Sequence, residues 1–209
     1  LKIGNDYYYL KADGSMSIGW RQIENSWYYF DTSGKVVMGW KQINGAWYYF
    51  GSDAKMITGW LNLNNTYYYL NTDGKMMTGW LSDNTNRYYM DSSNGAMAKD
   101  WKQIDGSWYY FNGSGHMQTG WVTMNGAYYY LDPSTGKMAA NTTLNINGIS
   151  YSFNANGVYQ NGGSAPSGSS SSSAPGFDTG GPGSSSSTPG GTSSGNTLKE
   201  GLTTGPGAH

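Results

Sequence analysis

The sequence predicts an all-β fold, a solenoid of stacked β-hairpins with about 20 residues per repeat, followed by a disordered tail. Three features lead to this prediction. A Gly-Trp pair recurs at a nearly constant interval, an aromatic triplet begins seven residues after each of these Trp residues, and a turn with Gly follows the triplet. The composition agrees with short strands and tight turns, because aromatic residues make up 16% of the chain and charged residues only 12%.

The first strand of each repeat is predicted to begin at a Gly-Trp pair. The spacings between successive Trp residues are 20, 20, 20, 21 and 20. A constant interval is typical of an array in which each unit buries apolar surface against its neighbours. The pairs are Gly19-Trp20, Gly39-Trp40, Gly59-Trp60, Gly79-Trp80 and Gly120-Trp121, with Asp100-Trp101 in the remaining place.

The second strand of each repeat is predicted at the aromatic triplet. In the repeat around residue 45, Asn44-Gly45 is a preferred two-residue hairpin turn, which sets Gln42 opposite Trp47 and Trp40 opposite Tyr49. Because side chains alternate between the two faces of a strand, this register predicts two different aromatic faces. One face carries Trp40, Trp47 and Tyr49, and the other carries Ile43, Tyr48 and Phe50.

The two ends of the array are predicted to be irregular. The first copy, residues 1–16, lacks its Gly-Trp pair, and the last copy, residues 141–162, has lost its Trp. Residues 163–209 are rich in Ser, Gly and Pro and contain no Trp or Tyr, so they cannot offset the entropy of ordering. We therefore predict a hairpin-repeat module over 1–162 and a flexible linker or tail over 163–209. Because Leu1 falls in the middle of the pattern, we interpret the chain as a fragment or processed form.

Several classes of function are disfavoured. The chain has no Cys for a disulfide or a thiolate site, and its formal net charge of −1 disfavours nucleic acid as a partner. No apolar run approaches the roughly 18 residues of a membrane span. Acids such as Asp31 and Asp132 recur at the start of turns, and His116 also takes a turn position. The sequence therefore predicts no catalytic site, metal site or cofactor, although an enzyme could be fused to this module in the full-length protein.

The choice of aromatic residues points to ligand binding. A dry core favours Leu, Ile, Val and Phe, whereas this chain repeats Trp and Tyr, which suit half-hydrated positions. The electron-rich faces of these rings attract quaternary ammonium groups, and the same faces stack on sugars. Three interpretations follow from the residues alone: a site for an ammonium ligand, a site for a carbohydrate, and aromatic packing with no ligand.

The repeat resembles a known family. The unit Gly-Trp-x6-Trp-Tyr-Tyr-Phe-x3-Gly-x-Met-x-Thr is similar to the choline-binding repeats of streptococcal cell-wall proteins, and Met56-Ile57-Thr58 before Gly59-Trp60 matches closely. The resemblance implies a secreted module that anchors its protein to the cell wall of a Gram-positive bacterium by binding phosphocholine of teichoic acids. Related repeats in glucosyltransferases and clostridial toxins bind sugars, so a glucan or a host glycan is the alternative ligand. Whether the protein forms a homo-oligomer stays open.

In the family, a choline cage lies between consecutive hairpins. It takes the Gly-Trp Trp and the first triplet residue of one hairpin, and a triplet Tyr of the next. By resemblance the sets are Trp20, Trp27 and Tyr48; Trp40, Trp47 and Tyr68; Trp60, Tyr67 and Tyr88; Trp101, Trp108 and Tyr129; and Trp121, Tyr128 and Tyr151. At Trp80 the first triplet position holds Arg87, whose charge would repel choline, so no site is expected there. The recurring Met residues, such as Met56, either close a cage or only pack between hairpins.

Overall fold

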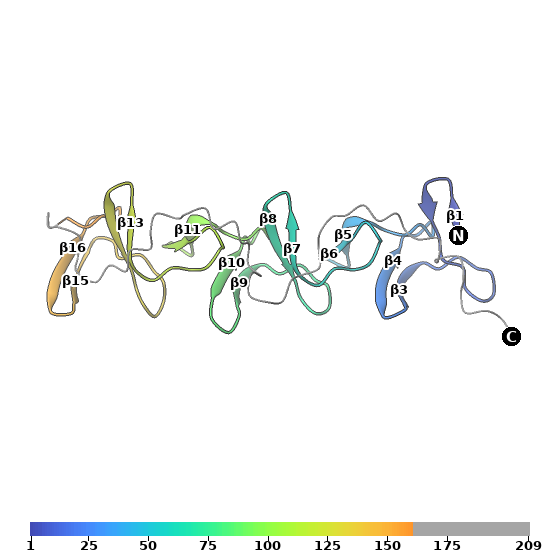
Figure 1. Ribbon diagram of the computed structural model, residues 1–209, viewed down its shortest axis with the longest axis horizontal. Coiled ribbons are helices and arrows are strands. Elements are labelled where there is room, and N and C mark those ends of the chain that lie inside the picture. Colours follow the sequence, from blue (N-terminus) through green and yellow to red (C-terminus); the bar gives the residue numbers. More distant parts are fainter. Residues whose placement is uncertain (161–209) are drawn as a thin grey trace. The chain divides into compact units, whose positions relative to one another are not determined.

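The computed structural model describes residues 1–160, which form strands and turns in two compact units. The unit Leu1–Met77 holds four antiparallel hairpins, which follow one another along the chain (Figure 1). Within the described residues, no helix has the length and hydropathy needed to cross a membrane. The hairpins of this unit are β1 (Lys2–Ile3) with β2 (Asp6–Tyr7), β3 (Gly19–Ile23) with β4 (Ser26–Phe30), β5 (Gly39–Ile43) with β6 (Ala46–Phe50), and β7 (Gly59–Leu63) with β8 (Thr66–Leu70).

The second unit begins at Thr78 and is built in the same way. Each of its strands pairs only with its hairpin partner in the sheets of the described chain, so the predicted solenoid of stacked β-hairpins is confirmed within each unit. Its hairpins are β9 (Gly79–Ser82) with β10 (Arg87–Met90), β11 (Asp100–Ile104) with β12 (Ser107–Phe111), β13 (Gly120–Met124) with β14 (Ala127–Leu131), and β15 (Thr142–Ile146) with β16 (Ile149–Phe153).

The predicted hairpin register is confirmed. In β5–β6, Gln42 pairs with Trp47 and Trp40 pairs with Tyr49. Both residues of the turn Asn44-Gly45 have positive φ, 48° and 82°. This turn geometry matches the twist of the flanking strands, and Asn and Gly reach it at low steric cost. The local choice of turn residues therefore fixes which side chains face each other across the hairpin.

The two faces of each hairpin differ in burial, as predicted. On β5–β6, Phe50 is fully buried, and Ile43 and Tyr48 are 6% and 7% exposed. On the opposite face Trp47 is 42% exposed. One face thus forms the apolar contact with the neighbouring hairpins, and the other keeps Trp and Tyr rings in reach of solvent.

Backbone hydrogen bonds join consecutive hairpins. After the turn that follows β6, the Met56 amide donates to the Trp27 carbonyl of the preceding hairpin at 2.7 Å, and the Ile57 amide donates to the Tyr49 carbonyl of its own hairpin at 2.9 Å. One short segment therefore binds both hairpins. The amide that makes the inter-hairpin bond belongs to Val36, Met56, Met76, Met117, Met138 and Tyr159 in successive examples.

Several Met residues of this segment pack against the next turn. The Met56 sulfur lies over Gly74 so closely that a Cβ on Gly74 would overlap it, and the same holds for Met117 and Gly136. Gly74 also has a φ of 79°, a region that residues with a Cβ avoid. The packing interpretation of these Met residues is therefore correct for the contact with the turn glycine.

The terminal repeats differ from each other. At the N-terminal end, β1 and β2 have two residues each, and Ile3 and Ile18 are 56% and 63% exposed. The last copy keeps two five-residue strands although it has lost its Trp. Its final Phe153 is 4% exposed, so this repeat still closes the apolar stack. The predicted tail, 163–209, and the last two residues of the predicted module lie outside the described residues.

Candidate functional site

The first candidate cage forms between β3–β4 and β5–β6. The Trp20 ring, from β3, meets the Trp27 ring of β4 at 88° with 6.2 Å between centroids. It meets the Tyr48 ring of β6 at 68° and 4.9 Å. Three rings from two consecutive hairpins therefore converge. Trp27 is 42% exposed, so the group of rings is open to solvent on that side.

The second candidate cage repeats this geometry one hairpin later. Trp40 meets Trp47 at 86° and 6.5 Å, and it meets Tyr68 at 69° and 5.1 Å. Behind Trp40, the Tyr49 ring lies at 5.2 Å with an angle of 72°. The Trp40 ring is thus contacted by rings of its own hairpin and by a ring of the next hairpin. The agreement of angles and distances shows that the repeat positions these side chains reproducibly.

Two further predicted sets lie in the second unit. Trp101 contacts Tyr129 at 5.0 Å, and Trp121 contacts Tyr151 at 4.9 Å. Trp108 stands on the hairpin face of Trp101, because its register partner is Gln103, and it is 40% exposed. Tyr128 has the corresponding place opposite Thr123. The structure therefore brings together the Gly-Trp Trp and the next hairpin's Tyr in both sets.

A ring that the sequence interpretation missed completes the last set. Tyr159 lies 6.0 Å from Trp121 and 5.5 Å from Tyr151, and its amide donates to the Tyr128 carbonyl at 2.9 Å. Its position two residues after Gly157 is the position that Met takes in other repeats. This spacing from the turn glycine is the sequence signal that could have identified Tyr159. The degenerate last repeat thus has an aromatic ring beside Trp121 and Tyr151 where other repeats have a Met.

The predicted set of Trp60, Tyr67 and Tyr88 draws on both compact units, so it stays a prediction from the sequence. Within its own unit, Trp60 contacts Tyr69 at 5.2 Å. In the other unit, Tyr88 donates to Asp83 at 2.9 Å, and its ring meets His116 at 5.3 Å. Burial, together with this hydrogen bond to a carboxylate, raises the pKa of Tyr88, so its phenol stays neutral at physiological pH.

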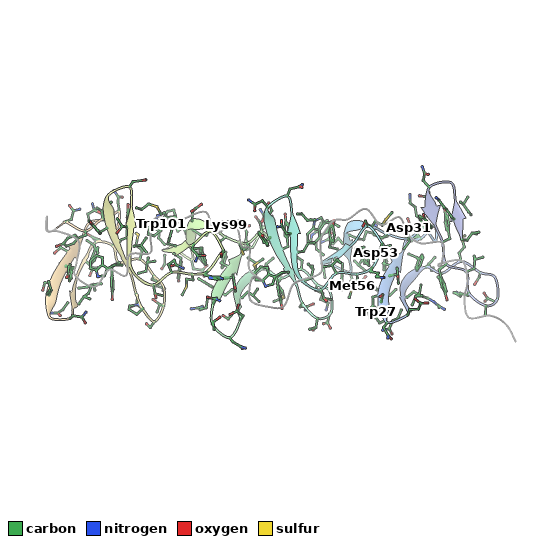
Figure 2. The ribbon with its side chains drawn as sticks, in the orientation of Figure 1. Trp27, Asp31, Asp53, Met56, Lys99 and Trp101 are labelled. Atoms are coloured by element: carbon green, nitrogen blue, oxygen red, sulfur yellow. The ribbon has the colours of Figure 1, made fainter. Side chains whose placement is uncertain are left out.

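The closing Met stands beside the first cage. Met56 and Trp27 lie close together (Figure 2), in agreement with the hydrogen bond between their backbones. Met56 packs against the cluster of Ile43, Tyr48 and Phe50, which also receives Trp20. A Met at this point adds a polarisable apolar surface next to the rings. The same residue therefore borders the cage and packs on the turn glycine.

The acidic residues serve the turns. Asp31 accepts hydrogen bonds from the backbone amides of Ser33 and Lys35, at 2.8 and 3.1 Å. At Asp132, hydrogen bonds from Ser134 and Thr135 lower the carboxyl pKa to about 2. In the described part of the chain, no three His, Cys, Asp or Glu residues are grouped so that they could hold a metal ion. The walls of the candidate cages therefore consist of neutral aromatic rings.

Comparison with known proteins identifies the family. A model of the choline-binding repeat matches residues 37–71, 57–100 and 98–142, and a model of a putative cell wall binding repeat matches residues 1–16 and 18–36. The chain belongs to the choline-binding repeat family. Among curated proteins, no match to this choline-binding repeat chain was found.

Solved structures of similar proteins come from Streptococcus pneumoniae. Choline binding protein F, determined with a peptidoglycan analogue, is 40% identical, with 77% of this chain and 56% of that chain covered and a TM-score of 0.68. CbpJ is 39% identical, with 77% and 57% covered and a TM-score of 0.68. The modular autolysin LytC, in complex with a synthetic peptidoglycan ligand, is 32% identical, with 73% and 35% covered and a TM-score of 0.57. This choline-binding repeat chain thus spans little more than half the length of the first two proteins.

Proposed function

We propose that this chain anchors its protein non-covalently to a bacterial cell wall by binding the choline of phosphocholine-bearing teichoic acids. The ligand sites are the aromatic cages between consecutive hairpins. The observation that carries the proposal is the convergence of the Trp20, Trp27 and Tyr48 rings, with ring distances of 6.2 and 4.9 Å from Trp20. Secretion and residence at the bacterial surface follow from this function.

The chemistry of the cage suits a quaternary ammonium. Such a cation has no N–H group, so it needs no hydrogen-bond acceptor and is best recognised by ring faces. Trp20, Trp27 and Tyr48 form a group of rings without a formal charge, and the exposed Trp27 leaves the group accessible from solvent. The phosphate and the polymer attached to choline can therefore remain outside the cage.

The strength of one site is modest. Each cation–π contact contributes about 0.5–2 kcal/mol, so three rings give a few kcal/mol and a dissociation constant on the order of millimolar. Retention on a wall then depends on several sites that engage one choline-bearing polymer. The repeated cages at Trp20, Trp40, Trp101 and Trp121 supply that number.

A carbohydrate ligand is the competing function. Sugar sites place polar side chains beside a ring, and Gln22, Gln42 and Gln103 stand opposite Trp residues. However, the Gln42 amide already donates to the Gly45 carbonyl of its own turn at 3.4 Å. A side chain engaged in this way is less suited to bind a hydroxyl group, which favours choline.

The test is a titration of the chain with choline, followed by Trp fluorescence and by the melting temperature. We expect saturation at millimolar choline and a rise in melting temperature, because a ligand that binds only the folded chain stabilises it. The neutral isostere 3,3-dimethylbutan-1-ol has the shape of choline without its charge and should act far more weakly. An equal response to both would contradict a cation cage, and a response to isomaltooligosaccharides alone would establish the carbohydrate alternative.

Variants locate the sites. Trp27→Ala removes an exposed wall and should remove one choline site, leaving the other sites unchanged. Ile149→Ala is the matched control, because Ile149 is an exposed apolar strand residue, 53% accessible, outside the cages. For the wall itself, the chain should be retained by beads bearing phosphocholine but not by beads bearing phosphoethanolamine. Equal retention on both would argue against recognition of the trimethylammonium group.

A further inference from the structure

The junction between β9–β10 and β11–β12 has the same aromatic walls as the candidate cages. Trp80 meets Tyr109 at 5.0 Å and 70°, and it meets Phe111 at 6.0 Å. In the first cage, Trp20 meets Tyr48 at 4.9 Å and 68°. Trp80 also packs on the buried cluster of the following hairpin, which includes Tyr109 and Phe111. The two walls that the Gly-Trp Trp and the next hairpin provide are therefore in place.

The third wall is replaced by a cation. Arg87 pairs with Ser82 across the hairpin, as Trp27 pairs with Gln22 in the first cage. The Arg87 Cζ lies 4.6 Å from the centroid of the Trp80 ring, whereas the centroids of Trp27 and Trp20 are 6.2 Å apart. The guanidinium thus lies over the Trp80 face, within the distance of a cation–π contact.

The position of Arg87 is fixed by the backbone. Its carbonyl accepts a hydrogen bond from the Met117 amide at 2.8 Å, the same inter-hairpin bond that joins Trp27 to Met56. The positive charge of its guanidinium therefore lies at this junction and opposes the entry of a second cation.

Other rings that lack a complete set of cage partners also meet cations of the chain. In the first copy, which has no Gly-Trp pair, Arg21 lies over Tyr9 at 4.9 Å and Lys2 lies over Tyr7 at 5.5 Å. These contacts repeat the pairing of Arg87 with Trp80. Cation–π contacts between side chains of this chain thus recur along it.

We propose that Arg87 is a built-in ligand of the Trp80–Tyr109 junction. Its guanidinium takes the place that choline takes in the other cages, so this junction is joined without choline and does not bind it. The choline part of this inference rests on the proposed function. The stabilising contact between Arg87 and Trp80 does not.

The first experiment uses the whole chain without choline. Arg87→Gln removes the charge and Arg87→Lys keeps it, so the melting temperature should fall further for R87Q than for R87K. A shift of about 2–4 °C corresponds to a contact of this kind in a chain of this size. Lys75→Gln is the control, since it removes an exposed turn cation. If R87Q melts at the temperature of the unsubstituted chain, Arg87 is not a structural ligand and the proposal fails.

The second experiment counts choline sites by isothermal titration calorimetry. R87W restores a first-triplet Trp beside Trp80 and Tyr109 and should add one site per chain, while W108A, at the same position of the next hairpin, should remove one. If R87W does not fold, R87Y replaces it, because Tyr67 and Tyr128 stand at this position elsewhere. If R87W or R87Y folds and binds the same number of choline molecules as the unsubstituted chain, the proposal is overturned. If the unsubstituted chain binds no choline at all, the proposed function fails, and the choline-free melting experiment still decides the role of Arg87.

Discussion

At the scale of single residues, the recurrent glycines have two different physical causes. A Cβ on Gly39 would have no neighbour within 4 Å, so the need for glycine there comes from its φ of 73°. Gly74 needs glycine for its φ and also for space, because the Met56 sulfur lies over it. Ala54 departs from this rule, with a φ of 60° and a fully buried side chain. An alanine fits at position 54 because Val36, from the preceding repeat, packs against it.

Val36 and Ala54 form a compensating pair. Val36 stands where most other repeats have Met, and it shares a buried cluster with Ala54. Val36→Met should overfill this cluster and cost about 1–3 kcal/mol of unfolding free energy. Adding Ala54→Gly should recover most of that loss, because the double variant recreates the Met–Gly pair. Urea unfolding of both single variants and of the double variant measures the coupling.

The reverse substitutions, from Met and Gly to Val and Ala, use the pair of Met56 and Gly74. Gly74→Ala should destabilise the chain through overlap with the Met56 sulfur and through its positive φ, and Met56→Val should relieve only the overlap. Strictly additive effects in both pairs would show that the two positions are not in contact.

Glu24 is a second residue whose backbone conformation conflicts with its type. It has a φ of 46° in the turn of β3–β4, at the position that Asn44, Asn64 and Asn125 take in other hairpins. Asn tolerates positive φ better than Glu does, so Glu24→Asn should stabilise the chain by about 0.5 kcal/mol. The control is Glu24→Gln, which removes the charge but not the conformational conflict. Equal stabilisation by both variants, measured in urea, would assign the effect to charge.

At the scale of elements, an ion pair links the turn after β10 to the next hairpin. The Lys102 ammonium, on β11, lies 2.6 Å from the Asp91 carboxylate. This contact, with hydrogen bonds from Ser93, holds the pKa of Asp91 well below its ordinary value. Because the folded-state pKa is the lower one, the pair stabilises the fold fully above the unfolded pKa of about 3.9. This stabilisation declines as the pH falls below that value and is lost as the pH falls through the folded-state pKa.

Asp91→Asn isolates the ion pair from the turn. Asn71 and Asn112 take the same place in other repeats and accept the same turn hydrogen bonds, so the variant should keep the turn. It should lose about 0.5–1 kcal/mol at pH 7, the range for a pair near the surface, and the difference from the unsubstituted chain should narrow as the pH falls below about 3.9 and vanish only when the pH passes the lower folded-state pKa. Unfolding curves at a series of pH values test this. A difference of the same size at pH 7 and at pH 2 would mean that the turn, not the ion pair, is affected.

Sequence patterns predicted the elements well where a local rule decides them. The Asn44-Gly45 turn and the alternation of side chains fixed the register of β5–β6 and separated the buried face of Phe50 from the half-exposed face of Trp47. Contacts between hairpins are different, because no rule of pairing says which neighbour supplies a ring. That assignment needed the family resemblance for Tyr48 and Tyr68.

Two features of the candidate sites depend on side-chain reach rather than on spacing. Arg87 was predicted to exclude choline, but its approach to the face of Trp80 follows only from the folded geometry. Tyr159 was missed because its segment departs from the Met pattern, although it lies beside Trp121 and Tyr151. Both positions are exceptions to the repeat, so the repeat itself could not reveal their contacts.

At the scale of the whole molecule, the number of cages matters more than the strength of any one. The formal net charge is −1, so attraction to the phosphates of a teichoic acid contributes little. Under the proposed function, binding then comes from several choline groups of one polymer. After the first cage is filled, each further cage meets choline at an effective concentration set by the polymer, which is on the order of millimolar.

Successive removal of cages should therefore act multiplicatively. Trp27, Trp47 and Trp108 are each about 40% exposed, so their replacement by Ala should leave the stack folded. On a phosphocholine surface, each added substitution should shorten retention several-fold, because it removes one intramolecular binding step. Towards free choline, the same variants should lose sites one at a time with unchanged affinity at the rest. Surface plasmon resonance and calorimetry on the single, double and triple variants separate the two patterns. A loss of all retention with the first substitution would mean that one cage carries the binding, and a proportional loss would mean that the cages do not share a polymer.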